Sequence, residues 1–498
     1  MIPIALGDVA AATGGRLTGG ADPAAVVSGV VVDSRAATGG DLFAAVPGER
    51  VDGHDYAATA LGAGAVAVLA ERDLGEDVPA VVVPGRVLDA LPALAAEVLA
   101  RRRALADDPA LSAPFDVVAV TGSSGKTSTK DLLAAVLAPL GPVVAPPGSY
   151  NNELGVPLTL LRVEEGTRSL VVEMGARGRG HIAHLCELAH PRVGAVLNVG
   201  SAHVGEFGSP EAIAVAKGEL VESLPPAGDG LTDGGIAVLN ADDHRVAAMA
   251  ERTRARVVTF GWGSAADVRA EDVRVDEMGR PSFTLVAGPS GLAGAGGRAD
   301  VAMRVHGEHH VSNALAAAAC ALAVGAELDD VAAALSTARA ASRWRMEVTE
   351  RPDGVVVVND AYNANPESVR AALRALKSMR RPGGRTWAVI GEMLELGDTA
   401  RDEHDAVGRY AVRLDVSRLV AVGEGARPVH TGAVLEGSYA DESVWVDGVD
   451  AAEALLAEEL RPGDVVLVKS SNGAGLLHLG DRLAAVGAST TGTGEAGS

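Results

Sequence analysis

Short apolar runs alternate with longer segments of helical periodicity through most of the chain. Between residues 117 and 260, five of these runs have the length and composition of buried strands: residues 117–120, 170–172, 193–199, 236–239 and 257–260. Alternation of strands and helices is typical of an α/β fold with a mostly parallel sheet. The pattern therefore predicts such a sheet in the middle of the chain.

A second series of apolar runs follows an alanine-rich segment at residues 314–341. Its members are residues 355–358, 386–390, 419–422 and 465–468. Helix-like segments separate these runs, so this part of the chain is expected to form a Rossmann-like domain.

Two changes in the pattern mark the expected domain boundaries. The first is a segment rich in Ala, Asp and Pro at residues 104–114, and the second is the end of the alanine-rich segment. We expect an α/β protein of three domains: an N-terminal α/β domain at residues 1–110, a central domain with a mostly parallel sheet at residues 111–341, and a Rossmann-like domain at residues 342–487. The tail at residues 488–498 is rich in Gly, Ser and Thr, which predicts disorder.

Length and charge narrow the possible functions. At 498 residues the chain is too long for one hydrophobic core, while 48% hydrophobic and 22% charged residues are ordinary for a globular protein. A formal charge of -22 repels polyanions, and no stripe of Lys and Arg with interleaved aromatic residues offsets it. This composition argues against nucleic acid as a partner. Phosphorylated small ligands would have to be bound by backbone N–H groups, a few cations and metal ions.

The sequence shows no sign of membrane insertion, disulfide bonds or structural zinc. No apolar run is as long as a membrane span, and the first residues lack the basic and apolar regions of a signal peptide. We therefore expect a cytoplasmic protein that does not insert into membranes. Cys186 and Cys320 are the two cysteines of the chain, without a CxxC motif, and are expected to be buried thiols.

One motif joins a strand, a glycine-rich loop and the start of a helix. The apolar residues 117–120 are followed by Thr121, Gly122, Ser123, Ser124, Gly125, Lys126, Thr127 and Ser128. The glycines allow backbone N–H groups to face a phosphate, Lys126 can reach terminal phosphates, and the Thr127 hydroxyl can ligate Mg²⁺. Val120 departs from the strict GxxxxGK[ST] pattern, in which this position is glycine. A surface turn is the alternative, but the flanking strand and helix favour ATP binding.

Two of the predicted central strands are followed by side chains that can bind a metal ion. Glu173 follows the run at residues 170–172, and His203 follows the run at residues 193–199. In open α/β sheets, ligands bind at the carboxyl ends of the strands. A carboxylate suits Mg²⁺, whereas a lone histidine is a less usual magnesium ligand and could equally cap a loop or lie in the core.

Further polar segments stand where helices are expected to begin. Ser312 and Asn313 precede the alanine-rich helix, so either residue could simply be its N-cap. After the run at residues 355–358, the chain continues with Asn359, Asp360, Ala361, Tyr362, Asn363, Ala364, Asn365 and Pro366. A plain turn from strand to helix needs only one or two such polar residues. This second segment is therefore predicted to contribute to a binding site.

In number and order, these motifs resemble those of the Mur ligase family of ATP-dependent amide ligases over almost the whole chain. The N-terminal part contributes Val32-Asp33-Ser34-Arg35, Gly40-Asp41-Leu42-Phe43 and Gly48-Glu49-Arg50-Val51-Asp52-Gly53-His54. The rest contributes Gly148-Ser149-Tyr150-Asn151-Asn152, Gly180-His181-Ile182, Ala216-Lys217-Gly218-Glu219-Leu220 and Arg345-Met346-Glu347. The resemblance implies a UDP-sugar-binding N-terminal domain, a central phosphate-loop ATPase domain and a Rossmann-like ligase domain.

The resemblance also implies roles for single residues. Residues 121–128 would hold the ATP phosphates, with Lys126 also catalytic. Thr127, Glu173, His203 and a carbamylated Lys217 would hold magnesium, and the last three would be catalytic. His309 and Asn313 would lie near the adenine, while Arg345 and Asp360 would close over the nucleotide. The substrate-binding residues would be Ser34, Arg35, Asn151, Asn152, Tyr362, Asn363 and Asn365.

Within the family, the motifs are most similar to those of the enzymes that add D-alanyl-D-alanine to UDP-N-acetylmuramoyl-tripeptide. ATP and Mg²⁺ would be the cofactors, and the protein would act as a monomer on these two small substrates in peptidoglycan synthesis. A free carboxylate does not condense with an amine in neutral water, so ATP would first convert it to an acyl phosphate. The three domains would then be expected to close around their ligands.

Two departures and two alternatives accompany the resemblance. His310 stands where the family usually has Asn, and Lys469-Ser470-Ser471-Asn472 replaces a familiar Lys-Gly-Ser-Arg. Another amino-acid ligase of the same superfamily is the near alternative, although the Asp-Asn-Pro-Arg motif of the diaminopimelate-adding enzymes is missing. A nucleotide-driven switch without ligase chemistry is the distant alternative, and it leaves the N-terminal motifs unexplained.

Overall fold

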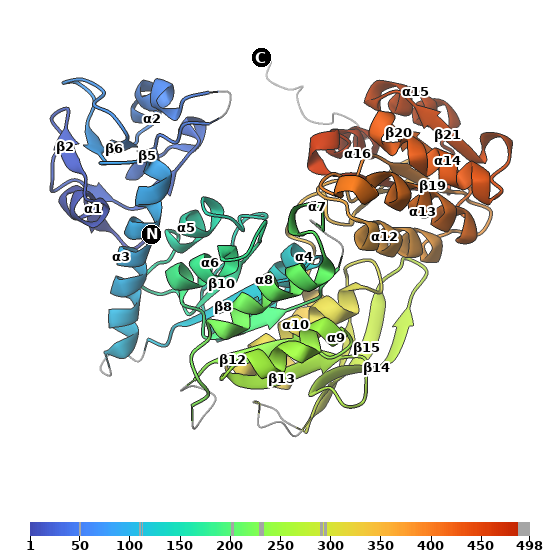
Figure 1. Ribbon diagram of the computed structural model, residues 1–498, viewed down its shortest axis with the longest axis horizontal. Helices are drawn as coiled ribbons and strands as arrows, with labels where there is room; N and C mark the ends of the chain where they lie inside the picture. Colours follow the sequence, from blue (N-terminus) through green and yellow to red (C-terminus); the bar gives the residue numbers. More distant parts are fainter. Residues whose placement is uncertain are drawn as a thin grey trace, which may run out of the picture.

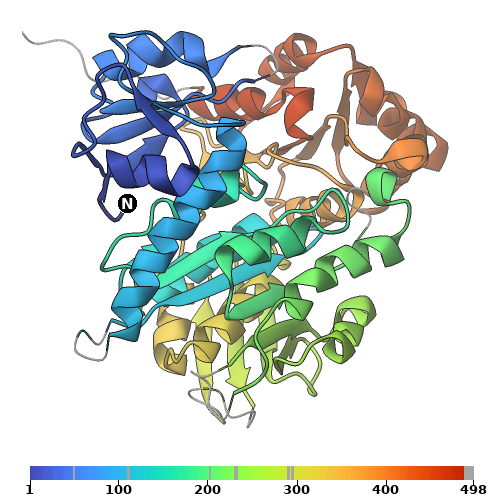
Figure 2. The same ribbon diagram turned by 60° about the vertical axis from the view of Figure 1, so that its left-hand side comes forward.

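The chain folds into three α/β regions, each built on its own sheet (Figure 1). The structure is a computed structural model, and it describes residues 1–48, 51–108, 111, 113–200, 204–228, 234–288, 292 and 296–486. Figure 2 shows the same regions from a second direction, with the N-terminal region in blue, the central region from cyan to yellow and the C-terminal region from orange to red. No helix in these ranges is both long and apolar enough to cross a membrane.

The N-terminal region holds a five-stranded sheet that is parallel apart from one edge strand. In sheet order its strands are β2 (Arg16–Thr18), β7 (Ala80–Val82), β6 (Ala67–Ala70), β5 (Asp41–Ala44) and β4 (Gly29–Val31). A small antiparallel pair, β1 (Ile4–Ala5) and β3 (Val26–Val27), lies beside it. The helices are α1 (Leu6–Thr13), α2 (Ala57–Gly62) and the long α3 (Val87–Asp107).

Helix α3 ties the N-terminal region to the central one. Its side chains share one apolar core with those of the central helices. The buried Arg102 guanidinium donates from Nε and Nη2 to the Thr167 carbonyl oxygen, at 2.9 and 2.6 Å. Arg102 also donates to the Ala113 and Pro114 carbonyl oxygens, and these bonds fix α3 against the central region.

The central region is a nine-stranded sheet with helices on both faces. In sheet order its strands are β16 (Arg298–Ala302), β15 (Pro281–Ala287), β14 (Val268–Val275), β13 (Arg256–Gly261), β12 (Ile236–Asn240), β11 (Val193–Val196), β8 (Asp116–Thr121), β10 (Ser169–Glu173) and β9 (Val143–Val144). The strands from β14 to β9 in this order, including β8, run parallel. At the other edge, β14 pairs antiparallel with β15, and β15 pairs antiparallel with β16.

Both faces of this sheet are covered, which explains the continuous apolar runs in the sequence. All residues of β8 are buried, with Val117 facing one core and Val118 facing the other. The described helices are α4 (Lys126–Leu137), α5 (Gly155–Leu160), α6 (His181–Ala189), α7 (Val204–Phe207), α8 (Pro210–Glu222), α9 (His244–Ala247), α10 (His310–Ala323) and α11 (Leu328–Thr337). Helices α4, α10 and α11 cover one face, and α5, α6 and α8 cover the other.

The C-terminal region is a six-stranded sheet between two layers of helices. Its strands, in sheet order, are β17 (Glu347–Glu350), β18 (Val356–Asn359), β22 (Val465–Lys469), β19 (Thr386–Ile390), β20 (Arg418–Val422) and β21 (Ser443–Val446). Only β17 is antiparallel within it. The helices are α12 (Pro366–Ser378), α13 (Ala400–Arg413), α14 (Arg427–Glu436), α15 (Val449–Glu459) and α16 (Leu477–Ala485).

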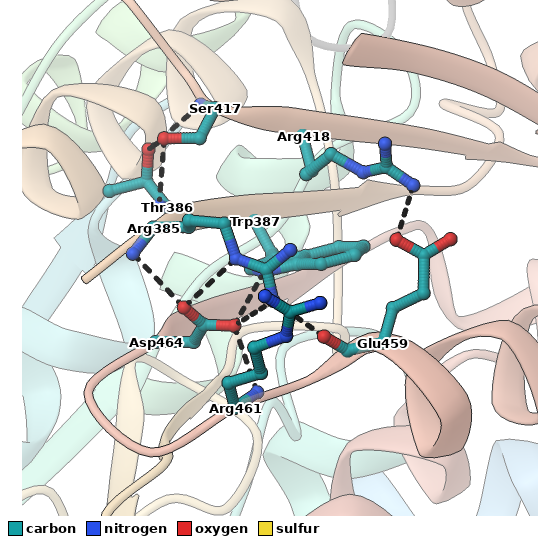
Figure 3. Close-up of polar contacts among 8 residues, drawn as sticks. All are labelled: Arg385, Thr386, Trp387, Ser417, Arg418, Glu459, Arg461 and Asp464. Atoms are coloured by element: carbon teal, nitrogen blue, oxygen red, sulfur yellow. Dashed lines mark hydrogen bonds and ion pairs between the residues drawn. The ribbon is translucent and has the colours of Figure 1, made fainter. Parts of the chain in front are cut away.

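A buried polar cluster joins the amino ends of this sheet's strands (Figure 3). The Asp464 carboxylate, directly before β22, accepts from Trp387 Nε1 at 3.0 Å and from Arg385 Nη2 at 2.7 Å. The Trp387 ring is fully buried, and the guanidinium groups of Arg385 and Arg418 lie 4.9 and 5.1 Å from its centroid. We refer to these residues as the Trp387 cluster.

The prediction of an α/β fold with mostly parallel sheets is confirmed, and each predicted apolar run contains a strand. The antiparallel extension of β14, β15 and β16 was not predicted. The domain boundaries near residues 110 and 341 remain predictions, and the tail predicted to be disordered lies outside the described residues. Both cysteines are buried free thiols, as expected.

Candidate active site

An open cavity of about 640 Å³ lies where the carboxyl ends of the central strands and of the C-terminal strands meet. Its lining includes Glu173 at the end of β10, Asn240 at the end of β12 and Lys469 at the end of β22. The loop before α4 contributes residues 123–125, and α4 itself contributes Lys126. Its position matches the place where open α/β sheets bind ligands.

The glycine-rich loop has the geometry of a phosphate site. Gly125 precedes α4 with a φ of 80°, in the left-handed region that favours glycine. A Cβ atom at Gly125 would lie 2.5 Å from Asn313 Oδ1, so a side chain there would obstruct the loop. Helix α4 begins directly after it, and its free N–H groups can bind an anion.

Lys126 is held back along its own loop. Its Nζ donates to the Gly122 carbonyl oxygen at 2.7 Å. Burial lowers the pKa of Lys126, the Glu173 carboxylate acts against this effect, and the Arg345 guanidinium adds to it. A bound polyphosphate would supply negative charge and stabilise the ammonium form.

Glu173 offers one carboxylate oxygen that can bind a metal ion. Its Oε1 accepts from Asn151 Nδ2 at 2.7 Å and from Ser149 Oγ at 3.2 Å. Its Oε2 is buried and has no hydrogen-bond partner in the described part of the chain. A buried oxygen without a partner suits Mg²⁺, which prefers hard oxygen ligands.

The other predicted metal ligands are only partly described. His203 lies outside the described residues, and within those residues no three His, Cys, Asp or Glu side chains form a group that could hold a metal ion. Thr127 lines the cavity, where its Oγ1 lies 2.7 Å from Ser149 Oγ. Glu173 and Thr127 can thus supply oxygen ligands from the described residues.

Lys217 lies on α8, and its side chain points inward. It is only 3% exposed and lines the cavity. In the described part of the chain its Nζ has no hydrogen bond or ion pair. Burial and the nearby Lys126 ammonium hold the pKa of Lys217 well below its ordinary value. The residue is therefore a buried amine whose surroundings disfavour the charged form, and not a solvated surface lysine.

Glu219 explains part of the motif around Lys217. Its carboxylate accepts from the backbone N–H groups of Gly180 at 2.6 Å and Ala183 at 3.1 Å. A carboxylate at the start of a helix satisfies free N–H groups and favours the positive end of the helix dipole. Glu219 thus fixes α8 against α6 and holds Lys217 in register.

The predicted adenine residues lie together on one side of the cavity. His309 and Asn313 both line it. Burial, with smaller contributions from the Lys469 and Arg374 cations, lowers the pKa of His309 to about 4, so the ring is neutral near pH 7. Asn313 Nδ2 lies 3.4 Å from Nδ1 of the buried His310, the residue that departs from the family pattern.

The N-cap interpretation of Ser312 and Asn313 is wrong. Helix α10 begins at His310, and its N-cap position is His309, so both residues lie inside the first turns. Ser312 Oγ accepts from Trp262 Nε1 at 2.9 Å instead. Asn313, which does not cap the helix, faces the phosphate loop through its Oδ1 atom.

The C-terminal region contributes three cations to the cavity, Arg345, Arg374 and Lys469. Arg345 Nη2 donates to Ser149 Oγ at 3.3 Å, and its guanidinium lies 4.4 Å from the centroid of the Tyr362 ring. Lys469 is buried, and its Nζ donates to Asp360 Oδ2 at 2.6 Å and to the Asn363 carbonyl oxygen at 3.0 Å. Asp360 is thus paired inside its own region, whereas the Arg345 side chain reaches Ser149 of the central region.

The asparagines of the substrate prediction have local contacts too. Asn365 is the N-cap of α12, where its side chain accepts from the Ser368 N–H at 2.8 Å. Asn363 Oδ1 accepts from the Ala364 N–H at 2.9 Å. Asn151, Asn152, Tyr362, Asn363 and Asn365 nevertheless all line the cavity.

Among the predicted residues that the structure describes, four do not line this cavity. Thr121 is buried and donates to the Met174 carbonyl oxygen at 2.9 Å, and Gly122 lies beneath the loop, where its carbonyl oxygen holds Lys126. Ser34 is buried in the N-terminal region, and the exposed Arg35 pairs with Asp33 at 2.7 Å. The N-terminal pair would have to serve a different part of a substrate.

Sequence reasoning did not single out Ser149 as a site residue. Its hydroxyl lies within hydrogen-bond distance of Thr127, Glu173 and Arg345. Ser149 stands between Gly148 and the Asn151-Asn152 pair, but a loop serine gives no signal of three long-range partners. Lys469 was quoted only as part of a departing motif, although it is one of the largest fully buried side chains.

Three models of one family match the chain in sequence order. The model described as "Mur ligase family, catalytic domain" matches residues 26–105, "Mur ligase middle domain" matches residues 120–321, and "Mur ligase, glutamate ligase domain" matches residues 344–472.

Relatives and solved structures agree with these models. The UDP-N-acetylmuramoyl-tripeptide--D-alanyl-D-alanine ligase of Mycobacterium tuberculosis (strain ATCC 25618 / H37Rv) is 50% identical over 92% of each chain. A crystal structure of MurF from Acinetobacter baumannii is 30% identical, with a TM-score of 0.80 over 97% of this chain and 99% of that one. The ADP complex of MurF ligase from Thermotoga maritima is also 30% identical, with a TM-score of 0.72 over 92% of this chain and 97% of that one. The chain belongs to the Mur ligase family.

Proposed function

We propose that this chain joins D-alanyl-D-alanine to UDP-N-acetylmuramoyl-tripeptide at the expense of ATP, forming the pentapeptide precursor of peptidoglycan. One observation carries the proposal: the phosphate loop, the open oxygen of Glu173 and the buried amine of Lys217 surround one cavity, to which Arg345 is added from the C-terminal region. The Mycobacterium tuberculosis relative carries the name of this reaction, which supports the choice of substrates.

The reaction needs activation of a carboxylate before the amide can form. Transfer of the γ-phosphate of ATP to the terminal carboxylate of the tripeptide gives an acyl phosphate and ADP. The amine of D-alanyl-D-alanine then attacks the acyl carbon, and a tetrahedral intermediate expels phosphate. Both steps concentrate negative charge on phosphoryl or carbonyl oxygens, so positioned cations and N–H groups are the catalytic requirement.

The residues of the cavity meet this requirement. Lys126 would leave the Gly122 carbonyl oxygen for the terminal phosphates, and Arg345 would neutralise the same charge from the opposite region. The N–H groups at the start of α4 would bind the phosphates without further reorganisation. Neutral His309 and Asn313 would contact the adenine, and Asp360 would help to close the third region over the nucleotide.

Magnesium would be held by Glu173 Oε2 and the Thr127 hydroxyl, together with His203 and Lys217. When bound, the ion would screen the charge of the phosphates. Burial lowers the pKa of Lys217 and so favours its neutral form, and a neutral amine reacts with CO₂ to give a carbamate and a proton. The carbamate oxygens would be hard anionic ligands, whereas an ammonium would repel the ion.

The remaining predicted residues would bind the two substrates. Ser34 and Arg35 of the N-terminal region would contact the UDP-sugar, and Asn151 and Asn152 would face its muramoyl part. Tyr362, with Asn363 and Asn365, would face the dipeptide from the C-terminal region.

A cytoplasmic location and a monomeric state are part of the same proposal, because both substrates are small and phosphorylated or zwitterionic. Another amino-acid ligase of the family is the second candidate, favoured only by the departing residues His310 and Asn472.

Phosphate release tests the proposal. With ATP, UDP-N-acetylmuramoyl-tripeptide and D-alanyl-D-alanine all present, we expect sustained release, and omission of either acceptor should reduce it to background. Lys126→Ala should abolish release while the protein stays folded, because the substitution removes charge rather than core packing. The exposed Lys377 on α12 provides a matched control, and Lys377→Ala should retain full activity. Release that ignores D-alanyl-D-alanine would contradict the proposal and favour a nucleotide switch.

A further inference from the structure

The segment at residues 342–346 joins the central and C-terminal regions, and it carries Arg345 into the cavity. Two non-glycine residues of this segment, Trp344 with a φ of 58° and Met346 with a φ of 50°, are in the left-handed region. Such conformations are unfavourable for residues with a side chain and persist only where surrounding contacts fix them. Two of them on either side of Arg345 indicate that its backbone is held in place.

Contacts within the C-terminal region fix one end of the segment. Trp344 Nε1 donates to Asp481 Oδ1 at 2.9 Å, and the Trp344 N–H donates to Glu347 Oε2 at 2.9 Å. The Met346 N–H donates to Asp360 Oδ1 at 3.1 Å. These bonds determine the backbone on both sides of Arg345.

Contacts with α4 fix the other end. The Ser342 N–H donates to Asp131 Oδ2 at 2.9 Å, and Ser342 Oγ donates to Asp131 Oδ1 at 3.1 Å. The buried Lys130 Nζ donates to Ser342 Oγ at 3.1 Å and to the Pro146 carbonyl oxygen at 2.8 Å, and it lies 2.5 Å from Asp131 Oδ1. All three hydrogens of the ammonium thus have an acceptor, which is the condition for burying a lysine.

These contacts tie the cavity together through α4. Lys130 and Asp131 lie one helical turn beyond Lys126 and Thr127, so one rigid helix carries both the phosphate-binding residues and the anchor of Ser342. Lys130 also holds Pro146, which precedes Ser149, and Ser149 Oγ is the acceptor for Arg345 Nη2. Arg345 and its acceptor are therefore both fixed with respect to the phosphate loop.

We propose that Lys130, Asp131 and Ser342 form a clamp that positions Arg345 over the terminal phosphate of ATP. The three residues are positioning residues, because they line up Arg345 and the loop without touching the reacting atoms themselves. The inference rests on the proposed function, since it assigns Arg345 to the phosphate charge. A displacement of about 1 Å in a group of this kind lowers the rate by up to about 100-fold.

The test is a double-mutant cycle between Ser342 and Arg345. Ser342→Ala should lower kcat about tenfold, with an unchanged KM for UDP-N-acetylmuramoyl-tripeptide, because the charge on the transferring phosphoryl group is met less well. In an Arg345→Ala background the same substitution should change kcat by less than about twofold, since its effect passes through Arg345. An equal loss of kcat in both backgrounds, or none in either, would overturn the clamp.

Two further variants keep the test decisive. Asp131→Asn replaces an acceptor of the Ser342 N–H or hydroxyl by a donor, so it should reproduce the loss if Ser342→Ala does not fold. Ser417→Ala is the matched control, because Ser417 Oγ, like Ser342 Oγ, accepts a hydrogen bond from a distant residue. Its donor is the Thr386 N–H at 3.2 Å, and Ser417 lies beside the Trp387 cluster rather than at the cavity. It should lower the unfolding temperature without lowering kcat.

Lys126→Ala separates this inference from the proposed function. If Lys126→Ala is inactive and Ser342→Ala has native kcat, the clamp alone is wrong. If Lys126→Ala turns over normally, the phosphate-loop assignment fails, and the clamp fails with it.

Discussion

The cavity and the Trp387 cluster lie at opposite ends of the same C-terminal sheet, and their buried carboxylates differ in how completely they are hydrogen-bonded. Strand β22 starts directly after Asp464 and ends at Lys469, so it connects the two. Asp464 accepts hydrogen bonds from Trp387 Nε1, from the backbone and side chain of Arg385, and from the Arg461 N–H (Figure 3). Around the cavity, in contrast, Glu173 Oε2 has no hydrogen-bond partner within the described ranges, and the buried Lys217 faces a second cation, Lys126.

The difference separates stability from function. A buried carboxylate with all its hydrogen bonds formed contributes to the folded state and has nothing left to offer a ligand. Buried groups that lack partners are unfavourable for folding and are usually completed by a ligand, an ion or a covalent modification. We therefore expect substitutions at the cavity to affect turnover first, and substitutions at the cluster to affect unfolding first.

Lys217→Ala should give the largest effect. Loss of the metal-binding group that we propose at Lys217 should lower kcat on the order of 100-fold or more, while the protein stays folded, because no hydrogen bond among the described residues is lost. Added short carboxylic acids should restore part of the activity by placing a carboxylate where the carbamate would be. Steady-state phosphate release, with and without acetate, measures both effects. Full activity of Lys217→Ala would show that the lysine is not needed for catalysis.

Asp464→Asn should show the opposite profile. The substitution keeps the shape of the side chain but weakens the bonds from Arg385 and Trp387, so the free energy of unfolding should fall by about 2 kcal/mol. Denaturant titration followed by tryptophan fluorescence would measure the loss, and kcat should stay within about twofold of the native value. A large drop in kcat with unchanged stability would contradict the division between the two regions.

Acid should reduce the stability difference between the native protein and Asp464→Asn, which is the smallest of the expected effects. Burial by itself would raise the pKa of Asp464, but hydrogen bonds from Arg385 and from the Arg461 N–H outweigh it and hold the pKa below its ordinary value. A carboxylate with a lowered pKa stabilises the fold above its unfolded pKa of about 3.9, and that contribution is lost as the pH falls through the folded pKa. The gap in unfolding temperature between native protein and Asp464→Asn should therefore narrow from pH 5 toward pH 3, as calorimetry can record. A gap that widens would be inconsistent with this sign.

The parts of the fold that follow from local pattern could be predicted from the sequence. Strand β8 and the loop after it are one continuous motif, because apolar strand, glycine turn and helix start follow each other directly. The capping box formed by Asn365 and Ser368 is also a local feature, although Asn365 was predicted to bind substrate and not to cap a helix.

Contacts between distant segments could not be predicted. Lys130 and Ser342 are 212 positions apart, and each is unremarkable in its own segment. The inward direction of Lys217 likewise depends on how α8 packs, since Ala214, Val215 and Ala216 around it fit either a buried or an exposed helix face. Only tertiary packing determines which face of the helix meets the cavity.

The mass of the product tests the central claim most directly. The protein would be incubated with ATP, Mg²⁺, UDP-N-acetylmuramoyl-tripeptide and an equimolar mixture of D-alanine and D-alanyl-D-alanine, and the UDP-sugar would be analysed by mass spectrometry. We expect the UDP-sugar to gain one D-alanyl-D-alanine unit, with one phosphate released for each unit added. A gain of a single residue, or no gain while ATP is consumed, would contradict the account.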